Sequence, residues 1–265
     1  MSDDMDGKHG VQSLEIGMGI LRAMVNGQRA MMLKDIAAAA DMPASKAHRY
    51  LVSLIRAGLV EQDPLTSRYD LGPFALNIGL VAIDRLDRVR LGLTAIAQLR
   101  DQINETTALA VWSDNGPVIV RWERPRRPIT VNVVTGTALD ILTSASGRVF
   151  AAWLNNEAVG KLIAKELKAG KTPPDLKTRA DVDALLAQVR TDGYSAISDY
   201  YLVTGVEAVA APVFNFRNEI TMVMLAVGVK GMFDTSPASP VVSGVKEAAA
   251  ALSVRLGYTG TPAGS

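Results

Sequence analysis

The chain has 265 residues, of which 48% are hydrophobic and 21% are charged, a composition typical of globular proteins and not of disordered ones. This length allows two domains of ordinary size, each with its own core. Cysteine is absent, which excludes disulfides, thiolate nucleophiles and cysteine-ligated zinc. The net charge of +1 does not by itself favour a polyanionic partner, because cations and anions nearly cancel.

Both histidines, His9 and His48, lie in the first fifth of the chain. The other four fifths therefore cannot hold a histidine-based hydrolase site or a histidine-rich metal site. No apolar stretch approaches the roughly 18 residues that a membrane span needs. The chain begins Met-Ser-Asp-Asp-Met-Asp, which is acidic, whereas a signal peptide begins with basic residues. We therefore expect a cytoplasmic protein that has no membrane partner.

The first part of the chain predicts three helices and a short hairpin. Apolar residues recur every three or four positions over residues 11–25, which is helical spacing. Further helices are predicted over 33–40 and 44–57, and Pro43 marks the break between them. Two short extended runs follow, 59–62 and 68–71, with the turn-forming sequence DPLTS between them. Helix, turn, helix and hairpin in this order predict a winged helix-turn-helix domain over residues 1–72.

Residues 73–104 predict a connecting helix, in one piece or two, and residues 105–265 predict a second domain of the α+β class. Strands are expected at 107–112, 117–124, 130–134, 194–199, 206–214 and 220–229, with a hairpin turn at Asp114-Asn115-Gly116. Helices are expected at 146–154, 157–169, 179–191 and 240–256.

The third predicted helix carries a polar face opposite the inward stripe of Ala47, Leu51 and Leu54. Its cations, hydroxyls and aromatic ring can contact phosphates and base edges in a major groove. An ordinary solvated helix face would look the same. Residues 8–60, however, hold seven cations against three anions, and the following hairpin adds a further arginine, which together favour nucleic acid binding. The predicted DNA contacts are Ser45, Lys46, Arg49, Tyr50, Ser53 and Arg68.

Four stretches, in the correct order, resemble the IclR family of bacterial transcriptional regulators. VQSLEIGMGILRAMV is similar to the family's first helix, and DMPASKAHRYLVSLIRAGLVEQDPLTSRYDLG to its recognition helix and wing. TGTALDILTSASGRVFAAWL and DGYSAISDYYLVTGVEAVAAPVF resemble two signature stretches of its effector domain. The resemblance implies a GAF-like effector-binding domain for an organic or aromatic acid. It also implies a homodimer or homotetramer that binds double-stranded operator DNA of near-palindromic sequence.

By matching positions, the resemblance implies which residues contact the effector. They are Leu142, Ala145, Ser146, Ser198 or Asp199, Val206, Ala208, Ala226 and Gly228. The choice between Ser198 and Asp199 stays open because residues 193–205 are one residue longer than usual. Many members carry hydroxyl groups where this chain has Ala226 and Gly228, and Arg148 replaces a common lysine. The small apolar residues Ala226 and Gly228 predict a pocket for an aromatic or largely apolar carboxylate. Plain core packing explains each predicted contact position equally well.

The sequence therefore predicts a ligand-responsive transcriptional regulator, not an enzyme, that needs no cofactor and no metal. Effector binding is expected to change the placement of two recognition helices through the connecting helix. One alternative is a small-molecule enzyme on the second domain with an appended DNA-binding module, using carboxylates such as Asp199 and Glu207. Another is an architectural DNA-binding protein without an effector, whose melting temperature no metabolite would change. The effector, the operator and the sign of regulation stay open.

Overall fold

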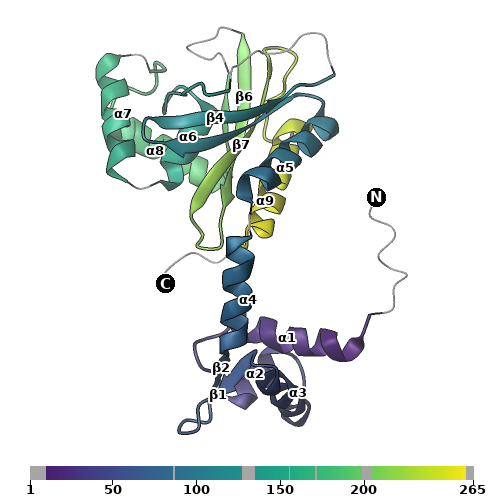
Figure 1. Cartoon of the computed structure of the whole chain (residues 1–265). Helices are drawn as coiled ribbons and strands as arrows, with labels where there is room; N and C mark the ends of the chain where they lie inside the picture. The colour runs from purple at the N-terminus through teal and green to yellow at the C-terminus, as the bar shows by residue number, and fades with distance from the viewer. Residues whose placement is uncertain are drawn as a thin grey trace. The chain divides into compact units, whose positions relative to one another are not determined.

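The computed structural model of the chain describes residues 10–85, 87–126, 135–154, 156–170, 172–198 and 205–260. The strand predicted at 130–134 lies outside these residues. The chain divides into two compact units, Met1–Leu86 and Asp87–Ser265, and each is described by itself (Figure 1).

The first unit holds the three helices and the hairpin that the sequence predicted for a winged helix-turn-helix, followed by a fourth helix from the predicted connecting segment. The elements are α1 (Gln12–Asn26), α2 (Leu33–Ala39), α3 (Ala44–Arg56), β1 (Val60–Gln62), β2 (Tyr69–Leu71) and α4 (Pro73–Asp84). The two strands pair antiparallel. Ile20, Ile36 and Leu51 are fully buried where α1, α2 and α3 meet. This core fixes α3 on the unit while leaving its opposite side in solvent.

The second unit is built on a five-stranded antiparallel sheet with the order β4-β3-β7-β6-β5. Its strands are β3 (Thr106–Ser113), β4 (Gly116–Glu123), β5 (Ser195–Ile197), β6 (Val206–Phe214) and β7 (Ile220–Val229). Asn115 lies in the β3–β4 turn, as predicted. After the undescribed gap, residues 136–139 hydrogen-bond along β4 before they lead to α6.

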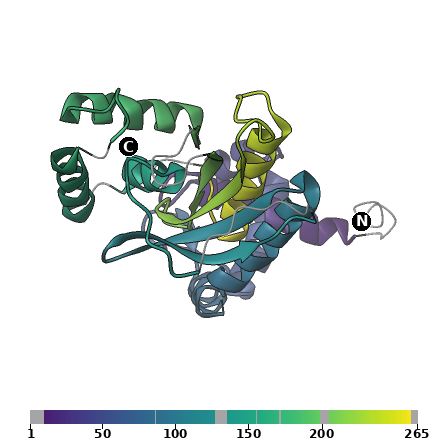
Figure 2. The ribbon, with the colours of Figure 1, turned by 90° about the horizontal axis from the view of Figure 1, so that it is seen from above.

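Helices cover both faces of this sheet (Figures 1 and 2). The helices are α5 (Arg88–Ile103), α6 (Ala145–Trp153), α7 (Glu157–Ala169), α8 (Arg179–Asp192) and α9 (Pro240–Arg255). On the face we call the α6 face, Ala208, Leu225 and Val227 share one core with α6, α7 and α8. On the other, the α5 face, Gly92 of α5 lies close to Leu109 and Met222. The α+β architecture predicted from the sequence is confirmed.

The predicted connecting helix consists of two helices, α4 and α5. Asp87 begins α5, and its carboxylate accepts a hydrogen bond from the Arg90 amide at 2.9 Å, which is the usual way to cap a helix start. In the part of the chain that the structure describes, no helix combines the length and apolar character needed to cross a membrane. Those same residues contain no cluster of three or more potential metal ligands.

Candidate functional site

The outer face of α3 presents most of the side chains predicted to contact DNA. Ser45, Arg49 and Ser53 are exposed, and Lys46 is half-buried at the edge of the face. The Ser53 hydroxyl donates to the Arg49 carbonyl oxygen at 3.3 Å, which leaves the hydroxyl's lone pairs available as acceptors. These residues lie together because helical spacing separates them from the buried stripe of Ala47, Leu51 and Leu54.

Tyr50 does not lie on this outer face. Its ring is half-buried and packs against the core of α1, α2 and α3, and a Cβ added to Gly17 of α1 would lie 3.8 Å from it. His48 and Arg56, which were not among the predicted contacts, are exposed beside Arg49. Arg56 follows Arg49 by two helical turns, so helical spacing alone would have found it.

The charge of the α3 face is positive and uncompensated. Among the described residues, none of Lys46, Arg49 and Arg56 forms an ion pair. The sequence of α3, ASKAHRYLVSLIR, also contains no acidic residue. Unpaired cations on an exposed helix face are the electrostatic requirement for contact with DNA phosphates.

The wing between β1 and β2 is a tight turn with two internal supports. The Asp63 carboxylate accepts hydrogen bonds from the amides of Leu65, at 2.7 Å, and Thr66, at 3.2 Å, and these bonds lower the pKa of Asp63. The Arg68 guanidinium donates to the Ala30 carbonyl oxygen at 2.8 Å. Arg68 therefore braces the wing against the loop that follows α1, while Leu65 at the tip is 94% exposed.

In the second unit, the loop of residues 140–144 leads directly into α6; we call it the pre-α6 loop. Leu142 of this loop is fully buried, as are Ala145 and Ser146 in the first turn of α6. The Ser144 hydroxyl caps the helix by accepting from the Gly147 amide at 2.8 Å. A Cβ at Gly147 would collide with the carbonyl oxygen of Ile141, so only glycine lets the loop lie this close to the helix.

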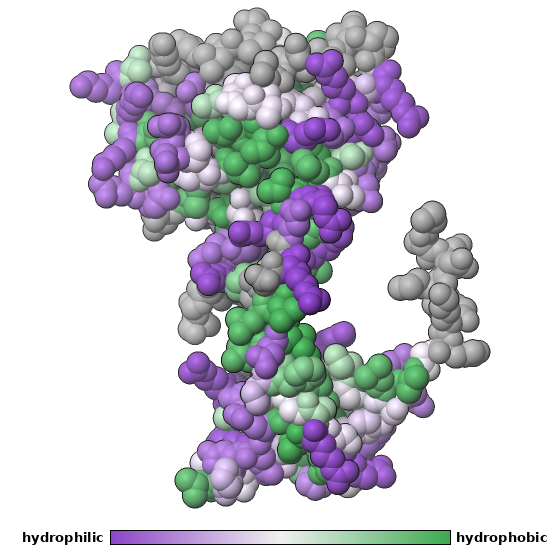
Figure 3. Space-filling view, in the orientation of Figure 1, coloured by the Kyte–Doolittle hydropathy of each residue, from purple (hydrophilic) through white to green (hydrophobic). Residues whose placement is uncertain are grey.

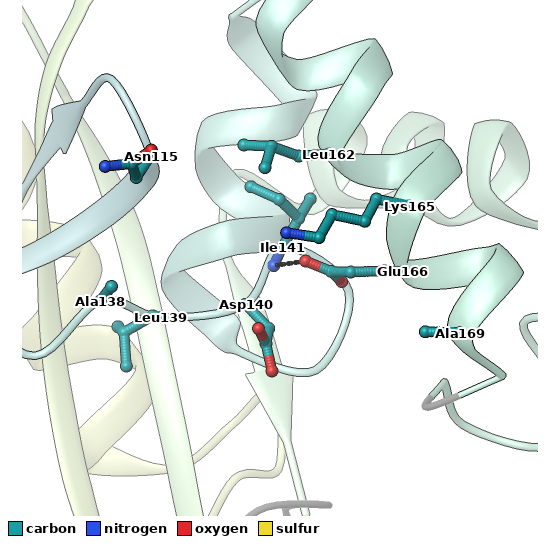
Figure 4. Close-up of a pocket in the computed structure, with 9 residues that line it drawn as sticks. All are labelled: Asn115, Ala138, Leu139, Asp140, Ile141, Leu162, Lys165, Glu166 and Ala169. Carbon is teal, nitrogen blue, oxygen red and sulfur yellow. Dashed lines mark hydrogen bonds between the residues drawn. The ribbon is translucent and has the colours of Figure 1, made fainter.

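A carboxylate from α7 holds the pre-α6 loop (Figure 4). The two oxygens of Glu166 accept from the amides of Ile141 and Leu142 at 2.7 and 2.8 Å. Burial raises the pKa of Glu166, against the lowering effect of these two hydrogen bonds. Glu166 also lines a pocket of about 280 Å³ together with Asp140 and Lys165. The loop is therefore anchored from outside the core that buries Leu142.

The structure brings together only part of the predicted effector-contact set. Val206 packs against the core of the α6 face, and Ala208 belongs to it, as do Leu142 and Ala145. Ala226 and Gly228 lie on the opposite, α5 face, because alternate residues of a strand point to opposite sides.

Phe233 fills the space that a side chain at Gly228 would occupy on the α5 face. The residues of β7 that do lie on the α6 face are Leu225 and Val227. A step of one residue along a strand moves each side chain to the other face, so the α6 face presents these two residues in place of Ala226 and Gly228.

Ser198 also lies away from the α6 face. It follows Ile197, which belongs to the core of the α6 face, and its hydroxyl donates to the Glu207 carboxylate at 2.6 Å. Glu207 pairs across strands with Gly228, so both lie on the α5 face. Asp199, the other predicted possibility, lies outside the described residues. The hydroxyl hydrogen of Ser198 is thus used in a hydrogen bond within the protein.

Two buried donors remain without partners in the described part of the chain: the Ser146 hydroxyl and the indole Nε1 of Trp122. Trp122 pairs across strands with Ala108, and its ring packs against the core of the α6 face. A buried donor without an acceptor costs about 1–3 kcal/mol. Such groups are candidates for hydrogen bonds to a ligand. No sequence pattern pointed to Trp122.

Comparisons with known proteins agree with this architecture. The model of the IclR helix-turn-helix domain matches residues 13–64. The model of the bacterial transcriptional regulator IclR C-terminal domain matches residues 81–254. The glycerol operon regulatory protein of Streptomyces griseus is 30% identical over 256 residues, which cover 93% of this chain and 97% of that protein.

Two solved structures extend the comparison. Pseudomonas aeruginosa HmgR superposes with a TM-score of 0.83 at 38% identity and covers 95% of this chain and 100% of its own. An IclR homolog from Microbacterium hydrocarbonoxydans, solved in complex with 4-hydroxybenzoate, gives a TM-score of 0.53 at 22% identity, with coverage of 92% and 98%. The second similarity concerns the fold alone.

Proposed function

The chain belongs to the IclR family of bacterial transcriptional regulators, and from this premise we propose that an organic acid, bound in the second unit, controls its attachment to operator DNA. Membership makes the chain a transcriptional regulator with a helix-turn-helix DNA-binding domain, not an enzyme. What we propose beyond membership is the set of DNA contacts, the chemical class of the effector and the formation of a homo-oligomer. Because operator DNA lies in the bacterial cytoplasm, we also propose that the protein is cytoplasmic. The observation that most supports DNA binding is the exposed face of α3, whose cations form no ion pair among the described residues.

We assign the DNA contacts of α3 to Ser45, Lys46, Arg49 and Ser53, with His48 and Arg56 added. Arg49 and Arg56 are exposed cations on one side of a helix, and a recognition helix uses such residues for phosphates and guanine edges. Arg68 acts indirectly, because its guanidinium braces the wing through Ala30. Tyr50 supports α3 from the core side and is left out of the contact set.

A second copy of the chain is the proposed partner of α4. Five large apolar side chains of this helix are 45–64% exposed: Phe74, Leu76, Ile78, Leu80 and Val81. Figure 3 shows this hydrophobic surface over α4. A helix that is apolar on all sides is normally covered. Two identical apolar helices related by a twofold axis cover each other, and the same axis supplies the second recognition helix that a near-palindromic operator requires.

The proposed effector site lies on the α6 face of the sheet. Its apolar walls come from Leu142, Ala208, Leu225 and Val227, which all belong to one core. The hydroxyl of Ser146, in the first turn of α6, is the proposed hydrogen-bond donor to the effector. Apolar walls with few polar groups suit an aromatic or largely apolar carboxylate, and a helix start favours its negative charge.

The indole of Trp122 is a second proposed donor, and it can also stack against an aromatic ring. The neighbouring IclR homolog that binds 4-hydroxybenzoate makes aromatic acids the first class to test. A thermal-shift screen of aromatic and short aliphatic acids provides the experiment. We expect aromatic acids to raise the melting temperature and to change affinity for a fragment from the promoter of the protein's own gene. Stabilisation by short oxo-acids alone would contradict the proposed pocket.

A further inference from the structure

The pre-α6 loop and the helix turn that follows it both contribute to the proposed effector site. Leu142 lies within the loop, and Ala145 and Ser146 follow it in the first turn of α6. Contact with a small ligand demands side-chain positions held to a fraction of an ångström. The loop is not part of any helix or strand, so something other than regular backbone pairing must hold it.

The main anchor of the loop comes from outside the proposed site. The Glu166 carboxylate receives two consecutive backbone amides, those of Ile141 and Leu142, one on each oxygen. Hydrogen bonds to an ionised acceptor are about twice as strong as neutral ones. Glu166 lies 25 positions after Ile141 and 24 after Leu142 in the sequence. Its hydrogen bonds therefore fix the position of the loop relative to α7.

The neighbouring contacts complete a clamp on the backbone of Leu142. The Arg148 guanidinium donates to the Leu142 carbonyl oxygen at 2.8 Å. The amide and the carbonyl of Leu142 are therefore both held by charged side chains, one from α7 and one from α6. The Ser144 hydroxyl donates to the Asp140 carbonyl oxygen at 2.6 Å, which closes the other end of the loop. Within this clamp, Glu166 is the side chain through which α7 holds the backbone of Ile141 and Leu142.

We infer that Glu166 is a positioning residue for effector binding: it holds the pre-α6 loop in the geometry that presents Leu142 and Ser146, without itself touching the effector. Its side chain lines the pocket of Figure 4, between α7 and the loop, together with Lys165, Asp140 and Asn115. This inference rests on the proposed effector site. It adds a residue that no position of the sequence resemblance included.

Hydrogen exchange of the full-length protein without ligand tests the clamp directly. Glu166→Gln keeps the size of the side chain but offers one acceptor oxygen and turns an NH2 group toward the second amide. We expect at least about tenfold faster exchange at Ile141 and Leu142, with α8 and β6 unchanged, because opening is local. Glu157→Gln is the matched control, since Glu157 lies on the same helix in an exposed ion pair with Lys161.

Glu166→Ala removes both acceptors and should accelerate exchange further than Glu166→Gln does. If the alanine variant fails to fold, the glutamine variant still decides the question. Exchange at residues 141 and 142 equal to wild type in Glu166→Gln would overturn the positioning role. Acceleration spread evenly over the second unit would also overturn it, because that pattern indicates a general loss of stability.

Calorimetric titration with 4-hydroxybenzoate then tests the link to the effector. Glu166→Gln should weaken binding about tenfold, whereas Glu157→Gln should not change it. Unchanged affinity in Glu166→Gln would overturn the link. Failure of the wild-type protein to bind this acid would instead contradict the proposed effector class, and the exchange result would still decide whether Glu166 positions the loop.

Discussion

The α3 face and the pre-α6 loop hold their functional groups in opposite ways. On α3, Arg49 and Arg56 are exposed and form no ion pair among the described residues. In the loop, Leu142 is fully buried, and its backbone N–H and C=O are each held by a charged side chain. A surface that binds DNA needs cationic side chains that are free to contact phosphates. A pocket that binds a small molecule needs lining residues that are held in one position.

The largest expected effect is on the DNA side of this comparison. Arg49→Ala removes an exposed, unpaired cation, so operator affinity should fall by about 1–3 kcal/mol, and the salt dependence of binding should decrease by about one unit of slope. Fluorescence anisotropy over a salt series measures both quantities. Arg179→Ala is the matched control, because Arg179 pairs with Asp183 on the surface of the second unit. Equal losses in the two variants would contradict the role of α3.

The apolar surface of α4 gives the next largest effect. Leu76→Asp places a charge in the proposed contact between copies and removes the burial of a leucine, which stabilises by about 1.5–3 kcal/mol. Sedimentation velocity should show a shift from dimer toward monomer. Leu65→Asp introduces the same charge at a leucine that is 94% exposed in the wing, and it should leave the oligomer intact. A dimer that persists in Leu76→Asp would place the interface elsewhere.

Removal of the buried Ser146 hydroxyl separates a ligand contact from a packing role. Ser146→Ala should weaken effector binding about tenfold, while the melting temperature without ligand stays equal or rises, because a donor without a partner destabilises the free protein. Thermal shift and calorimetry on the same samples provide the measurements. Ser243→Ala, at an exposed position of α9, serves as the control. A lower melting temperature with unchanged ligand affinity would assign Ser146 to packing alone.

The smallest effect concerns the wing. Hydrogen bonds to the amides of Leu65 and Thr66 lower the pKa of Asp63 in the folded protein. Its ionised form therefore stabilises the fold above the ordinary aspartate pKa, and this contribution disappears as the pH falls through the lowered value. In the wild-type protein, amide exchange at Leu65 should therefore become faster, relative to its intrinsic rate, as the pH falls through this range. Asp63→Asn should remove this pH dependence. An identical pH profile in the variant would show that the turn does not depend on the charge.

The sequence predicted the first unit more completely than the second. A single helix with period 3.6 separates Ala47, Leu51 and Leu54 from Arg49, so its exposed face follows from spacing alone. The half-buried position of Tyr50 does not follow from spacing, because the contact of its ring with the core depends on α1 and not on α3 itself.

In the second unit the order of helices and strands was predicted, but the faces of β7 were not. The strand presents Leu225 and Val227, not Ala226 and Gly228, on the α6 face, since a step of one residue moves each side chain to the other face. The contact of Glu166 with Ile141 joins residues 25 positions apart. No local pattern reveals a contact of that kind, because it depends on how α7 packs.

The most direct test of the account measures operator affinity with and without the effector. A fragment from the promoter of the protein's own gene is titrated by fluorescence anisotropy, in the absence and presence of an acid that raises the melting temperature. We expect affinity to change at least about fivefold in the wild-type protein and much less in Ser146→Ala at the same acid concentration. An acid that stabilises the protein but leaves operator affinity unchanged would contradict the account.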